Sequence, residues 1–342
     1  MNITTVGLDL AKSVYHVVCC NQAGKIIRKR ILRRSEILAF FSTLPKCLVG
    51  IESCSSAHYW AREIQKLGHQ VKLIAPQHVK PYVRGNKNDY NDALAIAEAV
   101  VRPQMRFVRI KSQEQLDIKA LHVLRKKCER DRTANCNGIR GILAEQGIVI
   151  PQGVSNVYKR LPELFDVQVD NGLSPLFKEL LEQHYQKLTE LNEHLDFYTK
   201  KIKLLSQSEE CQRLQDIPGI GPIVSSAVYE YIGNGSEFKN GRAVSASLGL
   251  VPRQHSSGGK QNLLGISKRG DVYLRTLLIH GARAVIRVNS GKTTPLAKWL
   301  DRLVVTRGRN KAAVALANKL ARVSWAILKH GSNYNEEYLV AA

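Results

Sequence analysis

The sequence has 342 residues, 44% of them hydrophobic, which is enough for two domains with well-formed cores. Lys and Arg total 51 against 29 Asp and Glu, a formal net charge of +22, which favours a polyanionic partner because neutralising phosphates releases counterions. No run of 18 apolar residues and no signal-peptide pattern is seen, so we expect a cytosolic protein without a membrane span. A basic surface without a specific partner is the alternative.

The seven cysteines are also informative. They form no C-x-x-C pair, and no Cys/His cluster has the spacing of a zinc site. We therefore expect buried, reduced thiols rather than disulfides or structural zinc.

The first part of the chain predicts an α/β domain, a mixed sheet covered by helices. The apolar segments that predict strands are residues 5–11, 14–20, 24–32, 47–53 and 70–76. The segments with helical spacing are residues 35–44, 57–68 and 92–101.

Two long helices are predicted next. Residues 113–145 are polar and helical, and residues 151–173 are predicted to be irregular because they contain proline and glycines. Spacings of four and three then form a heptad seam typical of a coiled coil, which either pairs with another protomer or folds back on the first helix. The seam residues are Phe177, Leu181, His184, Leu188, Leu191, Leu195, Tyr198, Ile202 and Leu205. We interpret the lone histidine as a packed polar residue rather than a ligand.

A second, mainly helical domain begins near Cys211. Its Pro218-Gly219-Ile220-Gly221 segment resembles a helix-hairpin-helix DNA-binding element, in which backbone N–H groups reach a phosphate unobstructed by side chains. Tight helix connections also favour glycine, so packing is the alternative. The expected domains are residues 1–150, a linker and coiled coil at 151–208, and residues 209–342.

Residues 253–329 are rich in Lys and Arg, whereas only Asp271 and Asp301 are acidic. Like charges without acidic partners repel one another, and a phosphate backbone would relieve this repulsion. The residues predicted to hold nucleic acid are Pro218, Gly219, Gly221, Arg253, Lys260, Lys268, Arg269 and Arg275. For Arg275, an ion pair on a helix surface is an equal alternative.

Four carboxylates come from the predicted sheet domain. Asp9 and Glu52 end two predicted strands, and Asp89 and Asp92 share one face of a helix start. Mg²⁺ prefers such hard oxygen ligands, and two ions can activate the attacking oxygen and stabilise the leaving oxygen in phosphodiester cleavage. The alternative interpretations are a turn residue for Asp9, an exposed strand end for Glu52 and a helix cap for Asp89.

A serine pair stands in a basic, glycine-flanked segment, Ser256-Ser257-Gly258-Gly259. A serine hydroxyl attacks a phosphodiester when a base or metal takes its proton, and nearby cations steady the charge of the transition state. A turn or phosphate-binding loop is the alternative interpretation of the local sequence.

The order Asp, Glu, Asp-x-x-Asp resembles the RuvC-like branch of the RNase H fold. Taken with PGIG, GLVPR from Gly249, SSG, ISKRG and LR, it closely resembles the DEDD-type insertion-sequence transposases, the bridge-RNA-guided recombinases with which Piv-type DNA invertases are grouped. The match covers about residues 4 to 330.

The resemblance implies a RuvC-like domain that binds Mg²⁺ through Asp9, Glu52, Asp89 and Asp92. It also implies a carboxyl-terminal transposase domain with a nucleophilic serine. The family's serine stands before glycine and eight residues after the glycine of GLVPR, which is Ser257 here. It further implies a homo-oligomer, a dimer or a tetramer with composite sites, and a noncoding bridge RNA that pairs with double-stranded donor and target DNA.

We therefore expect a bacterial transposase that recombines DNA through a serine-linked intermediate. A metal-only junction resolvase or nuclease is one alternative, and a non-catalytic nucleic-acid-binding protein is another.

Overall fold

The computed structural model describes residues 2–85, 88–256, 258, 260 and 262–336. It divides into two compact units, Met1–Ser112 and Gln113–Ala342. The division into three parts that we expected from the sequence, residues 1–150, 151–208 and 209–342, was based on expected function and stays a prediction. None of the helices in the described ranges is long and apolar enough to cross a membrane.

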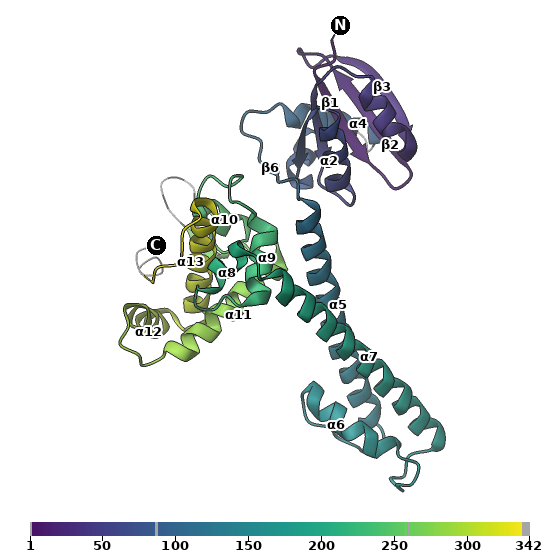
Figure 1. The fold of residues 1–342 in the computed structure, drawn as a ribbon, viewed down its shortest axis with the longest axis vertical. Coiled ribbons are helices and arrows are strands. Elements are labelled where there is room, and N and C mark those ends of the chain that lie inside the picture. Colours follow the sequence, from purple (N-terminus) through teal and green to yellow (C-terminus); the bar gives the residue numbers. More distant parts are fainter. Residues whose placement is uncertain (1, 86–87, 257, 259, 261, 337–342) are drawn as a thin grey trace. The chain divides into compact units, whose positions relative to one another are not determined.

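The amino-terminal unit is built on a six-stranded mixed sheet with the order β3-β2-β1-β4-β5-β6 (Figure 1). Strands β1, β4 and β5 are parallel, and the other neighbours pair antiparallel. The strands are β1 (Thr5–Leu10), β2 (Val14–Cys20), β3 (Ile26–Arg33), β4 (Leu48–Glu52), β5 (Gln70–Ile74) and β6 (Phe107–Val108). The predicted mixed sheet is confirmed. The two-residue strand β6 was not predicted from the sequence.

Helices cover both faces of this sheet. Alternating side chains of β2 divide between a core with α1 and α2, which also takes the apolar side chains of β1, and a second, smaller core with α4. The helices are η1 (Arg34–Glu36), α1 (Ile37–Ser42), α2 (Ala57–Lys66), α3 (Pro76–Val79), η2 (Lys80–Tyr82) and α4 (Asp89–Val100).

Gly7 lets α4 lie against β1. A β-carbon at Gly7 would lie 1.9 Å from the carbonyl oxygen of Ala93, so only glycine permits this approach. The close packing brings the amino-terminal turn of α4 next to the end of β1, where Asp9 stands.

The second unit begins with α5 (Gln113–Ala144), α6 (Val154–Phe165) and α7 (Pro175–Leu205). Helix α7 runs antiparallel along α5. Four aliphatic residues of the heptad seam, spaced seven positions apart, are buried. These are Leu181, Leu188, Leu195 and Ile202. The seam is therefore filled by α5 of the same chain, and Nδ1 of His184 lies 2.7 Å from Oδ1 of Asn135, the packed polar contact expected for it.

Helix α6 corrects the prediction of an irregular segment at residues 151–173. Val157, Leu161 and Leu164 recur at helical spacing and are buried against α5 and α7. The prediction rested on Pro151, Gly153 and Gly172, which lie outside this short amphipathic helix.

The remaining chain is mainly helical, as predicted, and contains one two-stranded hairpin. Helix α13 packs against α10, α11 and α12 around a single apolar core. The elements are α8 (Glu209–Gln215), α9 (Pro222–Ile232), α10 (Gly241–Ser247), β7 (Pro252–Gln254), β8 (Leu263–Ile266), α11 (Val272–Asn289), α12 (Pro295–Arg307) and α13 (Arg309–His330).

Candidate active site

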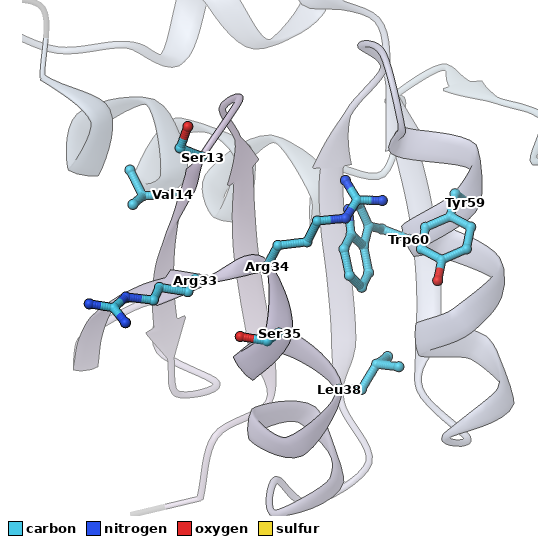
Figure 2. Close-up of a pocket in the computed structure, with 8 residues that line it drawn as sticks. All are labelled: Ser13, Val14, Arg33, Arg34, Ser35, Leu38, Tyr59 and Trp60. Carbon is cyan, nitrogen blue, oxygen red and sulfur yellow. The ribbon is translucent and has the colours of Figure 1, made fainter.

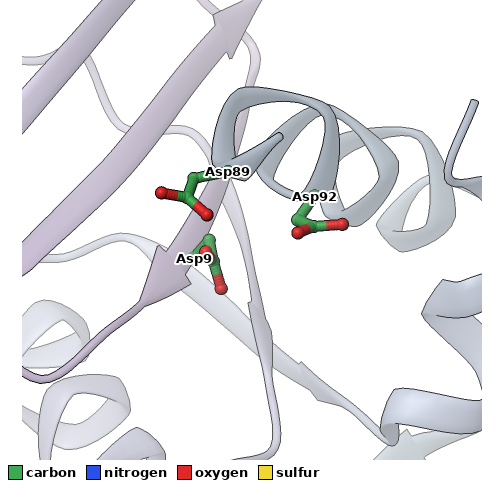
Figure 3. A group of neighbouring side chains, drawn as sticks. All are labelled: Asp9, Asp89 and Asp92. Atoms are coloured by element: carbon green, nitrogen blue, oxygen red, sulfur yellow. The ribbon is translucent and has the colours of Figure 1, made fainter. Parts of the chain in front are cut away.

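Three carboxylates converge where β1 ends and α4 begins. Asp9 is the last residue but one of β1, and Asp89 and Asp92 occupy the first turn of α4. Each offers one oxygen, and these oxygens all lie within 4.8 Å of one another (Figure 3). The Asn88 side chain caps α4 by accepting from the N–H of Tyr90 at 2.9 Å, which fixes the helix start beside the strand.

Glu52 stands beside this cluster. It is the last residue of β4, the parallel neighbour of β1, and the pairing of Leu8 with Ile51 brings it level with Asp9. Among the described residues, the mutually close set consists of the three aspartates and does not include Glu52. Its carboxylate nevertheless interacts electrostatically with Asp9 and Asp92.

The electrostatics of the cluster call for a cation. Burial, followed by the charges of Asp92 and Asp89, raises the pKa of Asp9 above its ordinary value. Burial, followed by Asp9 and Asp92, also raises the pKa of Glu52. Carboxylates that disfavour one another's charge in this way fit a divalent metal ion, which binds hard oxygen donors and neutralises them together.

The predicted serine segment lies between β7 and β8, and the structure describes Ser256 and Gly258 of it. Ser256 is engaged inside it, because its Oγ accepts from Nε2 of Gln254 at 3.0 Å and from the N–H of Asn262 at 3.4 Å. Ser257 lies outside the described residues. Four of the predicted basic contacts are exposed on or next to this hairpin, namely Arg253, Lys260, Lys268 and Arg269.

Arg275 differs from these four. Its side chain on α11 is buried, and Nη1 donates to the carbonyl oxygens of Leu248 at 3.0 Å and Arg269 at 2.8 Å. It therefore ties the segment that enters the hairpin to the segment that leaves it. The ion pair that the sequence left open for Arg275 is not among the contacts of the described residues.

The PGIG turn packs closely against α11. Gly219 has a φ of +88°, and a β-carbon on Gly281 would lie 2.2 Å from the carbonyl oxygen of Gly219. Packing thus accounts for glycine at position 219. Gly221 has open space where a side chain would be, so a phosphate contact of Pro218 and Gly221 stays a prediction.

Comparisons with known proteins decide the family. Residues 211–295 match the model "Transposase IS116/IS110/IS902 family", and residues 6–147 match a DEDD-type transposase model. The chain is 46% identical over 335 residues to a "Probable family 20 transposase" of Pseudomonas aeruginosa, an alignment covering 98% of this chain and 99% of that protein. This chain belongs to the IS116/IS110/IS902 family of transposases.

Other relatives agree. The transposase is 43% identical over 334 residues to "Transposase for insertion sequence element IS1111A" of Coxiella burnetii, with 97% of this chain and 92% of that one aligned. It is also 30% identical over 128 residues to the "Pilin gene-inverting protein" of Moraxella lacunata, covering 36% and 38% of the two chains. The predicted family and its link to the invertases are confirmed, and the three clustered aspartates lie in the DEDD domain.

Sequence reasoning did not single out His16, which borders the aspartate cluster. It is buried on β2 directly opposite Asp9, and its Nδ1 lies 3.6 Å from Oδ2 of Asp89. Its ring also packs edge-on against Tyr90. The two predicted strands at residues 5–11 and 14–20 held the signal, because a hairpin of that length places residue 16 near residue 9.

Proposed function

We propose that this transposase cuts and rejoins the double-stranded DNA of an insertion sequence through a covalent intermediate at Ser257. The observation that carries the proposal is the cluster of Asp9, Asp89 and Asp92 in a family of transposases. Glu52 completes the acidic motif that the resemblance implies. Mg²⁺ is the ion we propose for these carboxylates, and when bound it would neutralise charge at the scissile phosphate.

The local contacts favour Ser257 over Ser256 as the nucleophile. The Ser256 hydroxyl already accepts hydrogen bonds from Gln254 and Asn262, so we assign it a structural role. The adjacent serine precedes Gly258 and is flanked by the exposed Arg253 and Lys260. These cations would stabilise the negative charge that develops on the phosphate during attack.

The proposed chemistry conserves the phosphodiester. The Ser257 oxygen forms a bond to phosphorus, the bond from phosphorus to one strand oxygen breaks, and that oxygen leaves with a proton as a strand-end hydroxyl. A hydroxyl of the new partner strand then attacks the phosphoserine and releases the serine with its proton. Neither step consumes a high-energy cofactor, because each transfers the same phosphoryl group between oxygens.

Two further parts of the proposal rest mainly on the resemblance. A noncoding bridge RNA would guide the choice of DNA, and the net charge of +22 supports a nucleic-acid partner of either kind. A homo-oligomer, a dimer or a tetramer in the bacterial cytosol, is supported by large apolar side chains that α7 leaves exposed. These are Leu176, Leu180, Phe197 and Leu204.

The test combines full-length protein, Mg²⁺ and junction DNA of the element, with and without RNA transcribed from its flanks. A protein–DNA adduct is sought on a denaturing gel. Wild type and Ser256→Ala should form it, whereas Ser257→Ala and Asp89→Ala should not. Metal-dependent cleavage by Ser257→Ala without an adduct would establish a metal-only nuclease, and binding without cleavage by wild type would establish a non-catalytic binder.

A further inference from the structure

A pocket of about 730 Å³ opens on the amino-terminal unit (Figure 2). Its walls come from the loop before β2, from the end of β3 with η1, and from α2. The polar and aromatic lining residues are Ser13, Arg33, Arg34, Ser35, Tyr59 and Trp60. This volume lies within the range of small-ligand sites in proteins, about 300–1,000 Å³.

The pocket is cationic and aromatic together. The Arg34 guanidinium lies 5.2 Å from the Trp60 ring centroid and 5.7 Å from that of Tyr59. Its Nη1 also reaches the hydroxyl of Tyr15 at 3.4 Å. These contacts hold the guanidinium in place, so it is positioned before any ligand arrives.

Neither arginine is neutralised. Within the described ranges, no carboxylate lies within ion-pairing distance of Arg33 or Arg34. The carboxylate of the neighbouring Glu36 instead accepts from the backbone N–H of Arg33 at 2.6 Å, which caps the start of η1. The Arg34 guanidinium, held over the two rings and without a carboxylate partner in the described ranges, favours an anion such as a phosphate, whereas the Arg33 guanidinium points away from it (Figure 2).

Tyr59 supplies a second kind of contact. Its side chain is 42% exposed, whereas Trp60 beneath it is 3% exposed. The two rings meet edge to face at 5.0 Å, so the tyrosine stands on a fixed support. An exposed, supported aromatic ring next to cations is the arrangement on which unpaired bases stack.

The pocket lies at the same end of the sheet as the carboxylates. Arg33 pairs with Val14, and Val14 is two residues along β2 from His16, which pairs with Asp9. Strand geometry therefore separates the backbones of Val14 and Asp9 by only about 8 Å. The backbone distance from the carboxylate cluster to this pocket is therefore about one or two nucleotide lengths.

We infer that this pocket binds an unpaired nucleotide of the substrate DNA strand beside the scissile phosphate. Arg34 holds its phosphate, and Tyr59 stacks on its base. The inference rests on the proposed function, because the cluster must receive DNA for a neighbouring nucleotide to reach the pocket. It also predicts that the DNA end is locally unpaired when it is bound.

The test measures binding of fluorescent oligonucleotides to the full-length protein in EDTA, where metal-dependent cleavage is blocked. The probes are a duplex with a short single-stranded tail, the blunt duplex and RNA of the tail sequence. Arg34→Ala and Tyr59→Ala should each bind the tailed duplex about tenfold more weakly and the blunt duplex within about twofold of wild type. Arg28→Ala, an exposed arginine of β3 outside the pocket, is the control of equal charge change and should match wild type.

Tyr59→Phe should keep the affinity, since it keeps the ring. As a check that does not depend on variants, a tail carrying 5-iodouracil should crosslink to Tyr59 of wild type under ultraviolet light. Equal losses on blunt and tailed DNA, losses confined to RNA, or no loss relative to Arg28→Ala would each overturn the inference. Tail-specific binding with no DNA cleavage in Mg²⁺ would instead overturn the proposed function and leave the pocket assignment standing.

Discussion

His16 lies directly opposite Asp9 across the β1–β2 pairing, and its Nδ1 atom lies 3.6 Å from Oδ2 of Asp89. This nitrogen is buried and has no hydrogen-bond partner among the described residues. One imidazole therefore borders two of the three clustered carboxylates, from the strand that sequence reasoning had treated as ordinary core. Groups that border metal-binding carboxylates orient them and tune their basicity.

Replacing His16 should weaken metal-dependent cleavage. We expect His16→Ala to reduce activity or metal affinity about 10- to 100-fold, because Asp89 loses the side chain that borders it. His16→Gln should retain more activity than His16→Ala. The measurement is adduct formation across a Mg²⁺ titration, with thermal unfolding as the check on folding. Activity of His16→Ala equal to wild type at every Mg²⁺ concentration would remove His16 from the site.

The acidic cluster should cost stability until a metal ion binds. The pKa of Asp9 and of Glu52 is raised in the folded protein, so without divalent ions their contribution to folding falls as pH rises from about the ordinary aspartate value of 3.8 through the raised values. Asp9→Asn should therefore stabilise the metal-free protein at neutral pH, by about 1 kcal/mol or less because the site is partly solvated.

Added Mg²⁺ should make wild type more stable than Asp9→Asn. At 100 times its Kd, an ion that binds only the folded state adds about 2.7 kcal/mol, so wild type should gain Tm and Asp9→Asn should not. Differential scanning calorimetry with and without Mg²⁺ measures both effects. An equal Mg²⁺ response of the two proteins would show that the ion binds elsewhere.

Arg275 should act by holding the serine hairpin rather than by its charge. Arg275→Ala leaves the carbonyls of Leu248 and Arg269 without this donor and should destabilise the protein by about 1–3 kcal/mol. Arg275→Lys keeps the charge, but its shorter side chain does not reach the position of Nη1 that donates to both carbonyls, and we expect it to lose the DNA adduct as well.

Arg283→Ala serves as the matched control, because Arg283 is an exposed arginine on the same helix, α11. It should retain the unfolding temperature of wild type. Restoration of adduct formation by Arg275→Lys, at the level of wild type, would show that Arg275 contacts a phosphate instead.

A buried histidine should make the second unit sensitive to acid. Nε2 of His122 lies 3.1 Å from Oγ of Ser226, and Nδ1 lies 3.0 Å from the hydroxyl of Tyr273, which joins α5 to α9 and α11. Burial, with Arg125 as the next cause, lowers the pKa of His122 from 6.5 to about 4. The unfolded chain therefore takes up a proton before the folded chain does.

Stability should accordingly fall as pH drops from about 6.5 to about 4, by at most about 3 kcal/mol from this group. Urea unfolding between pH 4.5 and 7.5 measures the slope. His122→Gln, which can still hydrogen-bond but does not titrate, should show a flatter profile over this range. An unchanged profile would mean that another group controls the acid response.

Local patterns determined much of this protein. Short apolar runs predicted β1 and β2, and the heptad spacing of Leu181 and Leu188 predicted α7, because these patterns lie in neighbouring residues. The motif order placed Asp9 ahead of Asp89 and Asp92, and their clustering followed from the meeting of a strand end with a helix start. Helix α6 was missed because Pro151, Gly153 and Gly172 indicated an irregular segment and outweighed an apolar pattern only three turns long.

Contacts between distant segments were decided only by the tertiary structure. Nothing local to Arg275 predicts that it donates to the carbonyls of Leu248 and Arg269, and nothing local to Arg34 predicts its place over Trp60. The heptad seam did not identify its partner, because a heptad pattern packs equally against a helix of the same chain or of another protomer. The sequence by itself thus determined the elements and the acidic motif, and only folding decided which buried faces met, since packing energy depends on shape and distance across the chain.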